Sequence, residues 1–375
     1  MSSRPIKVLF AINCLNIGGA PSVVVSQLKG LDKNKFEPYL LTLYPSKAAN
    51  FLAEVNSFLP LNHQRHFKLK NRSIFDIKTL WQIYRFLRQE KFDLVYTHLF
   101  LTNLIVRVLA VLAGVKTIVS FEHSTYFNKN RWQIMVDRIL KHFTQAVVVS
   151  TETVADFTRK QQNLSVEQIV VIPNPLSVPT PESVNVDNLR QEFGIRPDLI
   201  TLITIGRFSS EKGHSLLIEA IKQLTEARAQ FLILGHGPLE KSLRQKVVDL
   251  KLEEQIKIIV APDRAKEFLY LADAFVLPSL REGQGLVVYE ALLAGVPVIS
   301  ADLPALKEII IDGDNGLLFE TGQASALTDV LDKFLTNPDL RVQLKQGVKN
   351  RPLNSPTVQS VEKLSELFYD LSRLS

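Results

Sequence analysis

Two carboxylates, Glu282 and Glu290, lie in one short segment whose chemistry suits a hydroxyl-rich, negatively charged ligand. Glu282 begins a loop with two glycines, and glycines let backbone N–H groups approach an anion closely. Glu290 lies in the apolar run LVVYEALLA, where it is the only charged side chain. A lone carboxylate in an apolar helix is costly unless a polar group meets it, and ligand hydroxyls would do so.

Three elements must position this pair. Residues 274–277 are predicted to form a strand, 286–294 a helix and 296–300 a second strand. Strand, loop, helix and strand make one βαβ unit, with the loop at the carboxyl end of its first strand. Open α/β sheets bind ligands at that edge, and the helix N-terminus favours an anion there.

A second segment carries positive charge. Arg207 and Lys212 lie in the run GRFSSEKG, between a predicted strand over 200–205 and a predicted helix over 214–224. Two cations near a helix N-terminus suit a diphosphate. The alternative is a surface Arg and Lys without a ligand. The glycine loop in the same half of the chain favours the phosphate interpretation.

Together these segments resemble the retaining glycosyltransferases of glycosyltransferase family 4. The stretch from Glu282 to Glu290 is similar to that family's E-x7-E motif. The resemblance implies an α/β fold of the GT-B type, in which two Rossmann-like doubly wound domains face a central cleft. It covers nearly the whole chain, because further segments stand where such enzymes have matching elements: Gly18-Gly19, Asp93–His98, His123 and Ile172-Pro173-Asn174.

The resemblance also implies residue roles. Arg207 and Lys212 would bind the donor diphosphate, where fixed positive charge stabilises the leaving group as the sugar–phosphate bond breaks. Glu290 would bind the ribose hydroxyls, and Glu282 the hydroxyls of the transferred sugar. The catalytic set is then His123, Arg207, Lys212 and Glu282. The donor-binding set is Gly18, Gly19, Arg207, Lys212, Gly283, Gln284, Gly285, Leu286, Val287 and Glu290.

One position departs from the family pattern. Gln284 stands where the family usually has Phe, and we expect altered packing beside the donor sugar. No metal and no other cofactor is expected, because the cations and the helix N-terminus would take a metal's place. Asp312-Gly313-Asp314 resembles a metal-binding D-x-D, but it lies in a DGDNG run that turn chemistry explains.

The histidines differ in their expected roles. His123 follows a predicted strand over 117–121, and the resemblance puts it near the transferred sugar; a structural histidine bonded to a backbone carbonyl is the alternative. His98, also at a strand end, is either structural or on the acceptor side. The remaining histidines are expected at the surface or in loops: His63, His66, His142, His214 and His236.

Domain boundaries follow from the order of predicted elements. Alternating strands and helices predict an N-terminal acceptor domain over 1–176 and a donor domain over 195–354, each with a parallel sheet. Residues 177–194, rich in Pro, Ser and Thr at their start, are predicted to be a linker. The helix within 355–375 is expected to return to the N-terminal domain.

Composition bounds the partners. The net charge of +6 suits phosphates or an anionic membrane, but no basic run with interleaved aromatics points to nucleic acid. With a single cysteine and a first strand rather than a signal peptide at its start, the chain is expected in the cytoplasm. Basic residues on the first half suggest peripheral contact with a membrane, a solvated face being the alternative: Arg65, Lys68, Lys70, Arg72, Arg131, Arg138 and Lys141, with Trp132 among them.

These features predict a retaining glycosyltransferase for surface glycan synthesis. It would move a hexose or N-acetylhexosamine from a nucleoside diphosphate sugar, UDP-linked before others, to a lipid-linked or saccharide acceptor. Two alternatives stay open: a UDP-sugar epimerase of the same fold, which would need no acceptor, and a non-catalytic nucleotide-sugar-binding protein. A glycoside hydrolase is disfavoured, because its two carboxylates would have to flank the scissile bond.

Overall fold

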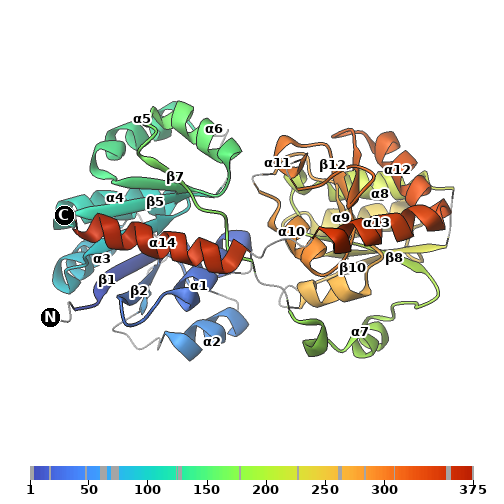
Figure 1. Cartoon of the computed structure of the whole chain (residues 1–375), viewed down its shortest axis with the longest axis horizontal. Helices are drawn as coiled ribbons and strands as arrows, with labels where there is room; N and C mark the ends of the chain where they lie inside the picture. Colours follow the sequence, from blue (N-terminus) through green and yellow to red (C-terminus); the bar gives the residue numbers. More distant parts are fainter. Residues whose placement is uncertain are drawn as a thin grey trace. The chain divides into compact units, whose positions relative to one another are not determined.

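The computed structural model describes most of the chain as two compact units (Figure 1). One unit comprises Met1–Pro175 with Pro356–Ser375, and the other comprises Leu176–Ser355. The residues described are 4–16, 18–46, 49–59, 66–68, 76–123, 125, 129–176, 179–225, 228–260, 264–282, 284–307, 309–351 and 356–373.

The first unit is built on a seven-stranded parallel sheet in the order β3-β2-β1-β4-β5-β6-β7. Its central strand β1 is fully buried from Val8 to Ile12, as expected for a strand covered on both faces. The strands are β1 (Ile6–Ile12), β2 (Phe36–Thr42), β3 (His66–Lys68), β4 (Leu94–His98), β5 (Thr117–Glu122), β6 (Ala146–Val149) and β7 (Ile169–Val171).

Helices cover this sheet. They are α1 (Gly19–Gly30), α2 (Ala49–Phe58), α3 (Ile77–Glu90), α4 (Phe100–Ala113), α5 (Arg131–Leu140), α6 (Glu152–Gln162) and the C-terminal α14 (Pro356–Arg373), with a 3-10 turn η1 (Lys141–Phe143) after α5. Helix α14 packs beside α1, and its Phe368 ring is fully buried against Phe10, Phe36 and Tyr96. Helix α14 therefore contributes to the hydrophobic core of the first unit, against residues of strands β1, β2 and β4.

The second unit has a six-stranded parallel sheet in the order β10-β9-β8-β11-β12-β13. Its strands are β8 (Ile200–Ile205), β9 (Ala229–Leu234), β10 (Ile256–Ile259), β11 (Ala274–Leu277), β12 (Val298–Ala301) and β13 (Gly316–Phe319). Its helices are α7 (Val186–Phe193), α8 (His214–Lys222), α9 (Glu240–Asp249), α10 (Leu286–Leu293), α11 (Pro304–Lys307), α12 (Ala324–Thr336) and α13 (Pro338–Asn350), and its 3-10 turns are η2 (Pro181–Ser183), η3 (Ser210–Lys212) and η4 (Ala265–Leu271).

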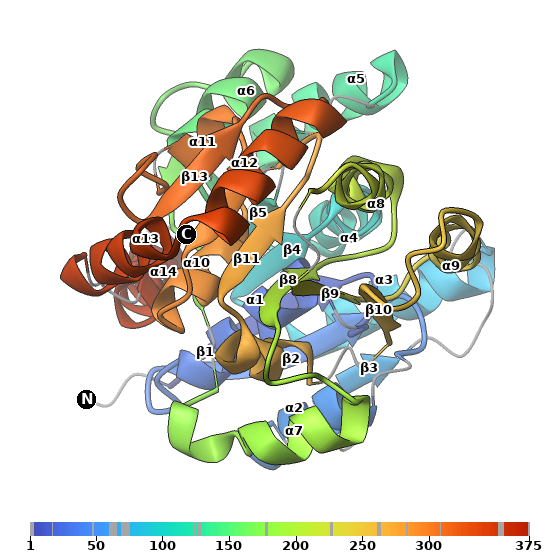
Figure 2. The same cartoon turned by 90° about the vertical axis from the view of Figure 1, so that its right-hand side faces the viewer.

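Two hydrophobic clusters flank this second sheet. Helices α8, α9 and α12 bury their apolar residues on one face, and α7, η4 and α10 bury theirs on the other (Figure 2). The α/β architecture of two Rossmann-like sheets is confirmed.

The predicted linker differs from the structure. Residues 186–193 form helix α7, and the two units meet in sequence at 175–176. The helix forms because Leu189 is fully buried and Phe193 packs against Phe268 of η4, while Asn185 caps its first turn. Eight residues with few apolar positions show too little periodicity to be recognised as a helix in the sequence.

In each sheet the strand order reverses at one place. The first strand of the first unit, β1, lies between β2 and β4, and the first strand of the second sheet, β8, lies between β9 and β11. Loops after two neighbouring strands diverge at such a point and leave room for a ligand. Gly18 and Gly19 follow β1, and the predicted donor-site residues of the second unit follow β8 and β11, whereas His123 follows β5, one strand beyond β4.

Candidate functional site

The loops after β8 and β11 are joined closely at the reversal point of the second sheet. The backbone N–H of Leu280 donates to the carbonyl of Glu211 at 2.8 Å. Between them Gly213 has a φ of 67°, and a Cβ atom there would lie 1.9 Å from the carbonyl oxygen of Pro278. Only glycine permits both this conformation and this approach, so the two predicted motifs are brought together by backbone contacts.

Lys212 and Glu282 meet at this junction. The Nζ of Lys212 donates to Oε1 of Glu282 at 2.5 Å, and the hydroxyl of Ser279 donates to the same oxygen at 2.8 Å. The Glu282 side chain is only 9% exposed and that of Lys212 is 25% exposed. The structure thus pairs the cation and the carboxylate that the sequence assigned to the diphosphate and to the sugar.

Arg207 differs from Lys212 in its surroundings. It follows β8 directly and its side chain is exposed. Among the described residues, no carboxylate lies within ion-pair distance of its guanidinium. The loop therefore carries one cation held by a carboxylate and one cation open to solvent or to an anion.

Helix α10 begins at the same edge. Gly285 forms its N-cap with a φ of 65°, and the helix runs through the predicted Leu286 and Val287. Four first-turn N–H groups at such an end lack partners within the helix. Gln284, just before the cap, is 5% exposed. Gly283 lies outside the described residues.

Glu290 is buried in α10 and has a partner from the protein itself. Lys266, on η4, places its Nζ 2.7 Å from Oε1 of Glu290. Burial raises the pKa of Glu290, and the charge of Lys266 opposes that rise. From the sequence, ligand hydroxyls were expected to meet this carboxylate. The structure adds a lysine 24 residues upstream, which no local motif links to Glu290.

In the first unit, His98 and His123 form a hydrogen bond. His98 Nδ1 and His123 Nε2 are 3.0 Å apart, at the ends of the neighbouring strands β4 and β5. Burial among Phe10, Tyr96 and Phe121 lowers the pKa of His98 well below its usual value, and burial lowers the pKa of His123 to about 3. Both rings are therefore neutral near pH 7, so each carries one N–H group. One of these two N–H groups donates in the hydrogen bond between the rings.

The remaining predicted residues of this unit lie after β1. Gly18 is the N-cap of α1 and Gly19 its first residue, at the reversal point beside β4. Leu99, directly after His98, has a φ of 69° and a ψ of 150°. Such strained backbone in a non-glycine residue costs about 1–3 kcal/mol and concentrates at functional sites. Gly18, His98 and His123 are thus positioned by neighbouring strands.

Comparisons with known proteins identify the chain. The family described as "Glycosyl transferases group 1" matches residues 185–351, and "Glycosyltransferase Family 4" matches residues 17–178. The chain belongs to glycosyltransferase family 4.

Relatives of this glycosyltransferase match over most of its length. It is 24% identical over 371 residues to the "UDP-Gal:alpha-D-GlcNAc-diphosphoundecaprenol alpha-1,3-galactosyltransferase" of Escherichia coli, covering 95% of this chain and 94% of the relative. It is 28% identical over 315 residues to "Putative glycosyltransferase EpsF" of Bacillus subtilis, covering 80% of each.

Solved structures share its fold. The Anabaena protein Alr3699/HepE, crystallised with UDP and glucose, superposes with a TM-score of 0.81 at 18% identity, over 97% of this chain and 100% of that one. WaaG, a glycosyltransferase of lipopolysaccharide biosynthesis, superposes with a TM-score of 0.74 at 15% identity, over 96% and 99%. The fold of the glycosyltransferase is GT-B.

The glycosyltransferase also contains a buried ionic cluster that the sequence did not reveal. Lys129 bridges Glu122 at 3.1 Å and Asp137 at 2.9 Å, and Arg107 lies 3.3 Å from Asp137. All four side chains are at most 4% exposed. Because Glu122 precedes His123 and Lys129 ends the loop after it, the cluster fixes both ends of that loop.

His214 corrects one expectation from the sequence. It was predicted at the surface or in a loop, but it is 2% exposed at the start of α8, packed against Phe208. Burial lowers its pKa to about 4. A polar residue at a helix N-terminus resembles a surface position in sequence, and only the packing of the loop after β8 encloses it. His63 lies outside the described residues, and nothing is described of the His66 side chain.

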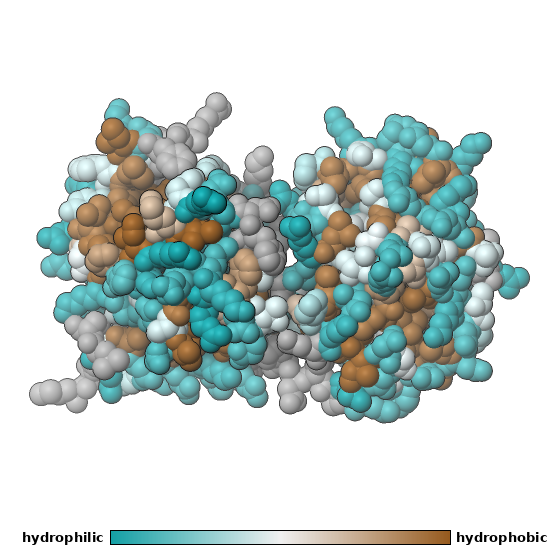
Figure 3. Space-filling model, turned by 90° about the horizontal axis from the view of Figure 1, so that it is seen from above, coloured by the Kyte–Doolittle hydropathy of each residue, from teal (hydrophilic) through white to brown (hydrophobic). Residues whose placement is uncertain are grey.

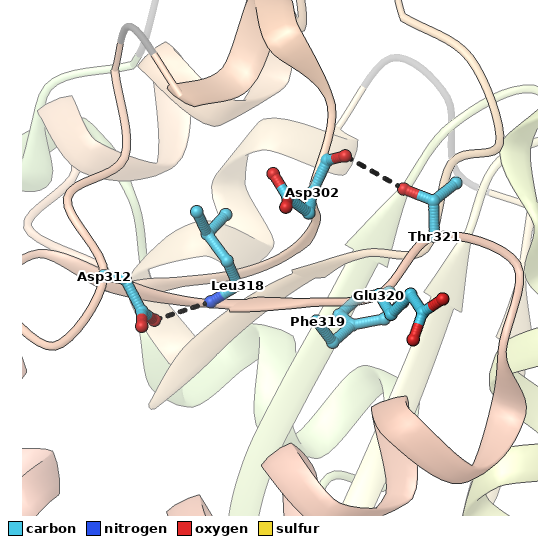
Figure 4. Close-up of a pocket in the computed structure, with 6 residues that line it drawn as sticks. All are labelled: Asp302, Asp312, Leu318, Phe319, Glu320 and Thr321. Atoms are coloured by element: carbon cyan, nitrogen blue, oxygen red, sulfur yellow. Dashed lines mark hydrogen bonds between the residues drawn. The ribbon is translucent and has the colours of Figure 1, made fainter.

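Asp312 lies beside an open hollow of about 480 Å³ that also includes Asp302 and Glu320 (Figure 4). Its carboxylate accepts from the backbone N–H of Leu318 at 2.9 Å, as a turn residue does.

Within the described ranges, His, Cys, Asp and Glu nowhere gather in a group of three that could hold a metal ion. Nor does any described helix combine the length and apolarity needed to cross a bilayer.

Proposed function

We propose that this enzyme transfers a hexose or N-acetylhexosamine from a UDP-sugar, with retention, to a lipid-linked or saccharide acceptor. The observation that carries the proposal is the junction of Lys212 and Glu282 beside the N-terminus of α10. This junction puts a cation, helix N–H groups and a carboxylate at one sheet edge, and we propose that the carboxylate binds hydroxyls of the transferred sugar. The Anabaena neighbour crystallised with UDP and glucose supports the choice of donor.

The chemistry follows from these groups. The acceptor hydroxyl oxygen forms a bond to the anomeric carbon while the bond from that carbon to the β-phosphate oxygen breaks. The hydroxyl proton passes to the departing phosphate, on the same face of the sugar, and UDP leaves. Negative charge develops on the diphosphate, so Arg207, Lys212 and the N–H groups of Gln284 to Val287 stabilise the transition state more than the ground state. We propose that they do so without a metal.

His123 has a defined role in this proposal. Its Nε2 is engaged by His98, and burial keeps both rings neutral. His98 Nε2 is buried, and none of the described residues offers it a hydrogen-bond partner. A ring nitrogen without a proton is easier to bury unpaired than an N–H group. His98 then donates from Nδ1, which leaves His123 with its proton on its own Nδ1. His123 would offer that proton to a hydroxyl of the transferred sugar.

The acceptor is proposed from the relatives. The Escherichia coli relative is named for transfer to a diphosphoundecaprenol-linked sugar, so a polyprenyl diphosphate sugar is the first acceptor to test. Such an acceptor lies in a membrane, and we propose that the enzyme works at the cytoplasmic membrane face.

The test is a matrix of UDP-sugars with and without undecaprenyl diphosphate N-acetylglucosamine, in buffer containing EDTA. The proposal expects UDP release that depends on the acceptor and persists in EDTA, and a product whose anomeric proton coupling matches that of the donor. Epimerised donor without acceptor would support the epimerase alternative. UDP binding without turnover in any combination would support a binding protein, and an inverted product would exclude retention.

A further inference from the structure

Helices α4 and α5 each bury one charged residue and expose apolar residues. Arg107 of α4 and Asp137 of α5 pair at 3.3 Å, with both side chains almost fully buried. On α4, Val108 and Leu112 are exposed, and the neighbouring helix α5 exposes further apolar residues. For α5, which buries only Asp137 and Leu140, this reverses the usual arrangement of a surface helix, whose apolar residues face the core.

The outward side chains of α5 form a stripe. Trp132, Met135, Ile139 and, on η1, Phe143 follow one another at spacings of three and four residues and are 51%, 57%, 53% and 47% exposed. Figure 3 is seen from the side on which α5 and α6 lie in Figure 1, and apolar side chains gather on that face of the first unit. Contiguous exposed apolar patches mark interaction surfaces.

In the segment that carries this stripe, the exposed charged residues are all basic. Between Phe100 and Phe143 the only acidic residues are Glu122 and Asp137, and both are buried in the ionic cluster. Arg131 and Arg138 are exposed beside the stripe. Arg138 and Lys141 donate to the backbone carbonyls of Gln161 and Asn163, so their positions are fixed but their charges are not neutralised.

From this arrangement we infer that the outward face of α4, α5 and η1 docks on the surface of an anionic lipid bilayer. Large apolar side chains enter the interface, and arginine and lysine beside them meet the phosphates of the lipid headgroups. A second protein copy would bring the same cations against themselves, which disfavours a symmetric dimer. The patch is distinct from the basic segment around 65–72, most of which lies outside the described residues.

The location of the stripe suits a lipid-linked acceptor. Trp132 lies nine residues after His123, at the edge of the sheet where β5 ends. A bilayer against α5 would therefore hold the headgroup of an embedded acceptor at the same edge as His123. This step rests on the proposed function, whereas membrane docking itself does not.

The binding test uses vesicles with 30% phosphatidylglycerol in phosphatidylcholine, pure phosphatidylcholine vesicles, and co-sedimentation at physiological salt. The wild type should bind the anionic vesicles. The double variant Met135→Ser/Ile139→Ser should lower the partition coefficient by roughly tenfold or more, because half-exposed apolar side chains lose their transfer into the interface. Arg138→Gln/Lys141→Gln should lower anionic binding by roughly fivefold per charge and leave any neutral binding unchanged.

A matched control removes apolar side chains elsewhere. Val248→Ser/Val342→Ser alters two exposed positions of the second unit, 51% and 69% exposed, and should bind as the wild type does. Trp132 gives a direct reporter: the chain has two tryptophans, so in a Trp81→Phe background its emission should shift to the blue on adding anionic vesicles.

Several results would overturn the inference. One is absence of wild-type binding to the anionic vesicles at physiological salt, and another is equal binding of Met135→Ser/Ile139→Ser. The others are an unshifted Trp132 emission and a wild-type dimer in sedimentation velocity that this double variant dissociates. UDP titrations on the same samples separate the two proposals. UDP binding without vesicle binding refutes only the docking surface, and vesicle binding without UDP binding refutes only the proposed function.

Discussion

Replacing Lys212 with methionine should remove the charge that we propose stabilises the leaving diphosphate, while keeping the length of the side chain. Lys212 Nζ lies 2.5 Å from Glu282 Oε1, so the change also leaves a nearly buried carboxylate without its cation. The scale of the lost attraction between these two side chains follows from Coulomb's law: at an effective dielectric constant of about 20, two opposite unit charges about 4 Å apart attract by about 4 kcal/mol. Loss of one preorganised donor costs about 10²–10³ in kcat, and we expect Lys212→Met to lose at least that.

The pairing predicts a particular double-mutant result. In Lys212→Met, the free carboxylate of Glu282 repels the diphosphate, so adding Glu282→Gln removes a penalty as well as a sugar contact. The loss of activation free energy in the double variant should therefore be smaller than the sum of the losses in the two single variants. The difference, which is the coupling free energy, should be about 0.5–3 kcal/mol, as for residues in direct contact.

The assay is the initial rate of UDP release with the donor and acceptor that support turnover, with melting temperatures measured in parallel. Lys246→Met is the matched control, because Lys246 is 26% exposed and pairs with Glu219 on the surface of the same unit. It should leave the rate unchanged. Near-normal turnover in Lys212→Met, or strictly additive losses in the double variant, would refute the reasoning.

Three further predictions concern stability. Burial lowers the pKa of His123 to about 3, whereas its pKa in the unfolded chain is about 6.5. Between these two values the unfolded chain binds more protons than the folded one. The free energy of unfolding should therefore be highest above pH 6.5 and fall as the pH decreases towards 3, by up to about 1.4 kcal/mol per pH unit. Urea titrations at several pH values should show a shallower loss in His123→Gln, and an unchanged slope would contradict this. Gly213→Ala should destabilise the second unit by several kcal/mol in thermal melts, whereas Gly313→Ala, with a φ of 77° and open surroundings, should cost about 1 kcal/mol; equal effects would argue against the close approach of the two loops. Lys266→Met should leave Glu290 buried and uncompensated, and since burial raises its pKa the variant should be more stable near pH 5 than at pH 8; the opposite pH trend would contradict the pairing.

Much of the second unit could be predicted from its sequence, for a physical reason. Parallel strands covered on both faces are short apolar runs, and the runs at 200–205 and 274–277 match β8 and β11 residue for residue. The predicted site residues after these strands then had to share one sheet edge. What the sequence could not give was the junction itself, because it depends on Gly213 packing against a backbone carbonyl 65 residues away.

Other features depended on contacts between distant segments. Lys266 was missed because η4 carries no motif that links it to α10. The inverted orientation of α5 was missed because its apolar residues have the same periodicity whichever side faces the core. Only the buried partners of Asp137, Arg107 and Lys129, show which face points inward.

The central claim is that the loops after β8 and β11 and the start of α10 hold the diphosphate of the donor. A crystal structure with UDP bound tests it most directly. We expect phosphate oxygens within hydrogen-bond distance of Lys212 Nζ and of N–H groups between Gln284 and Val287, with the ribose at Glu290. UDP bound at another edge, with Lys212 still closed on Glu282, would contradict it.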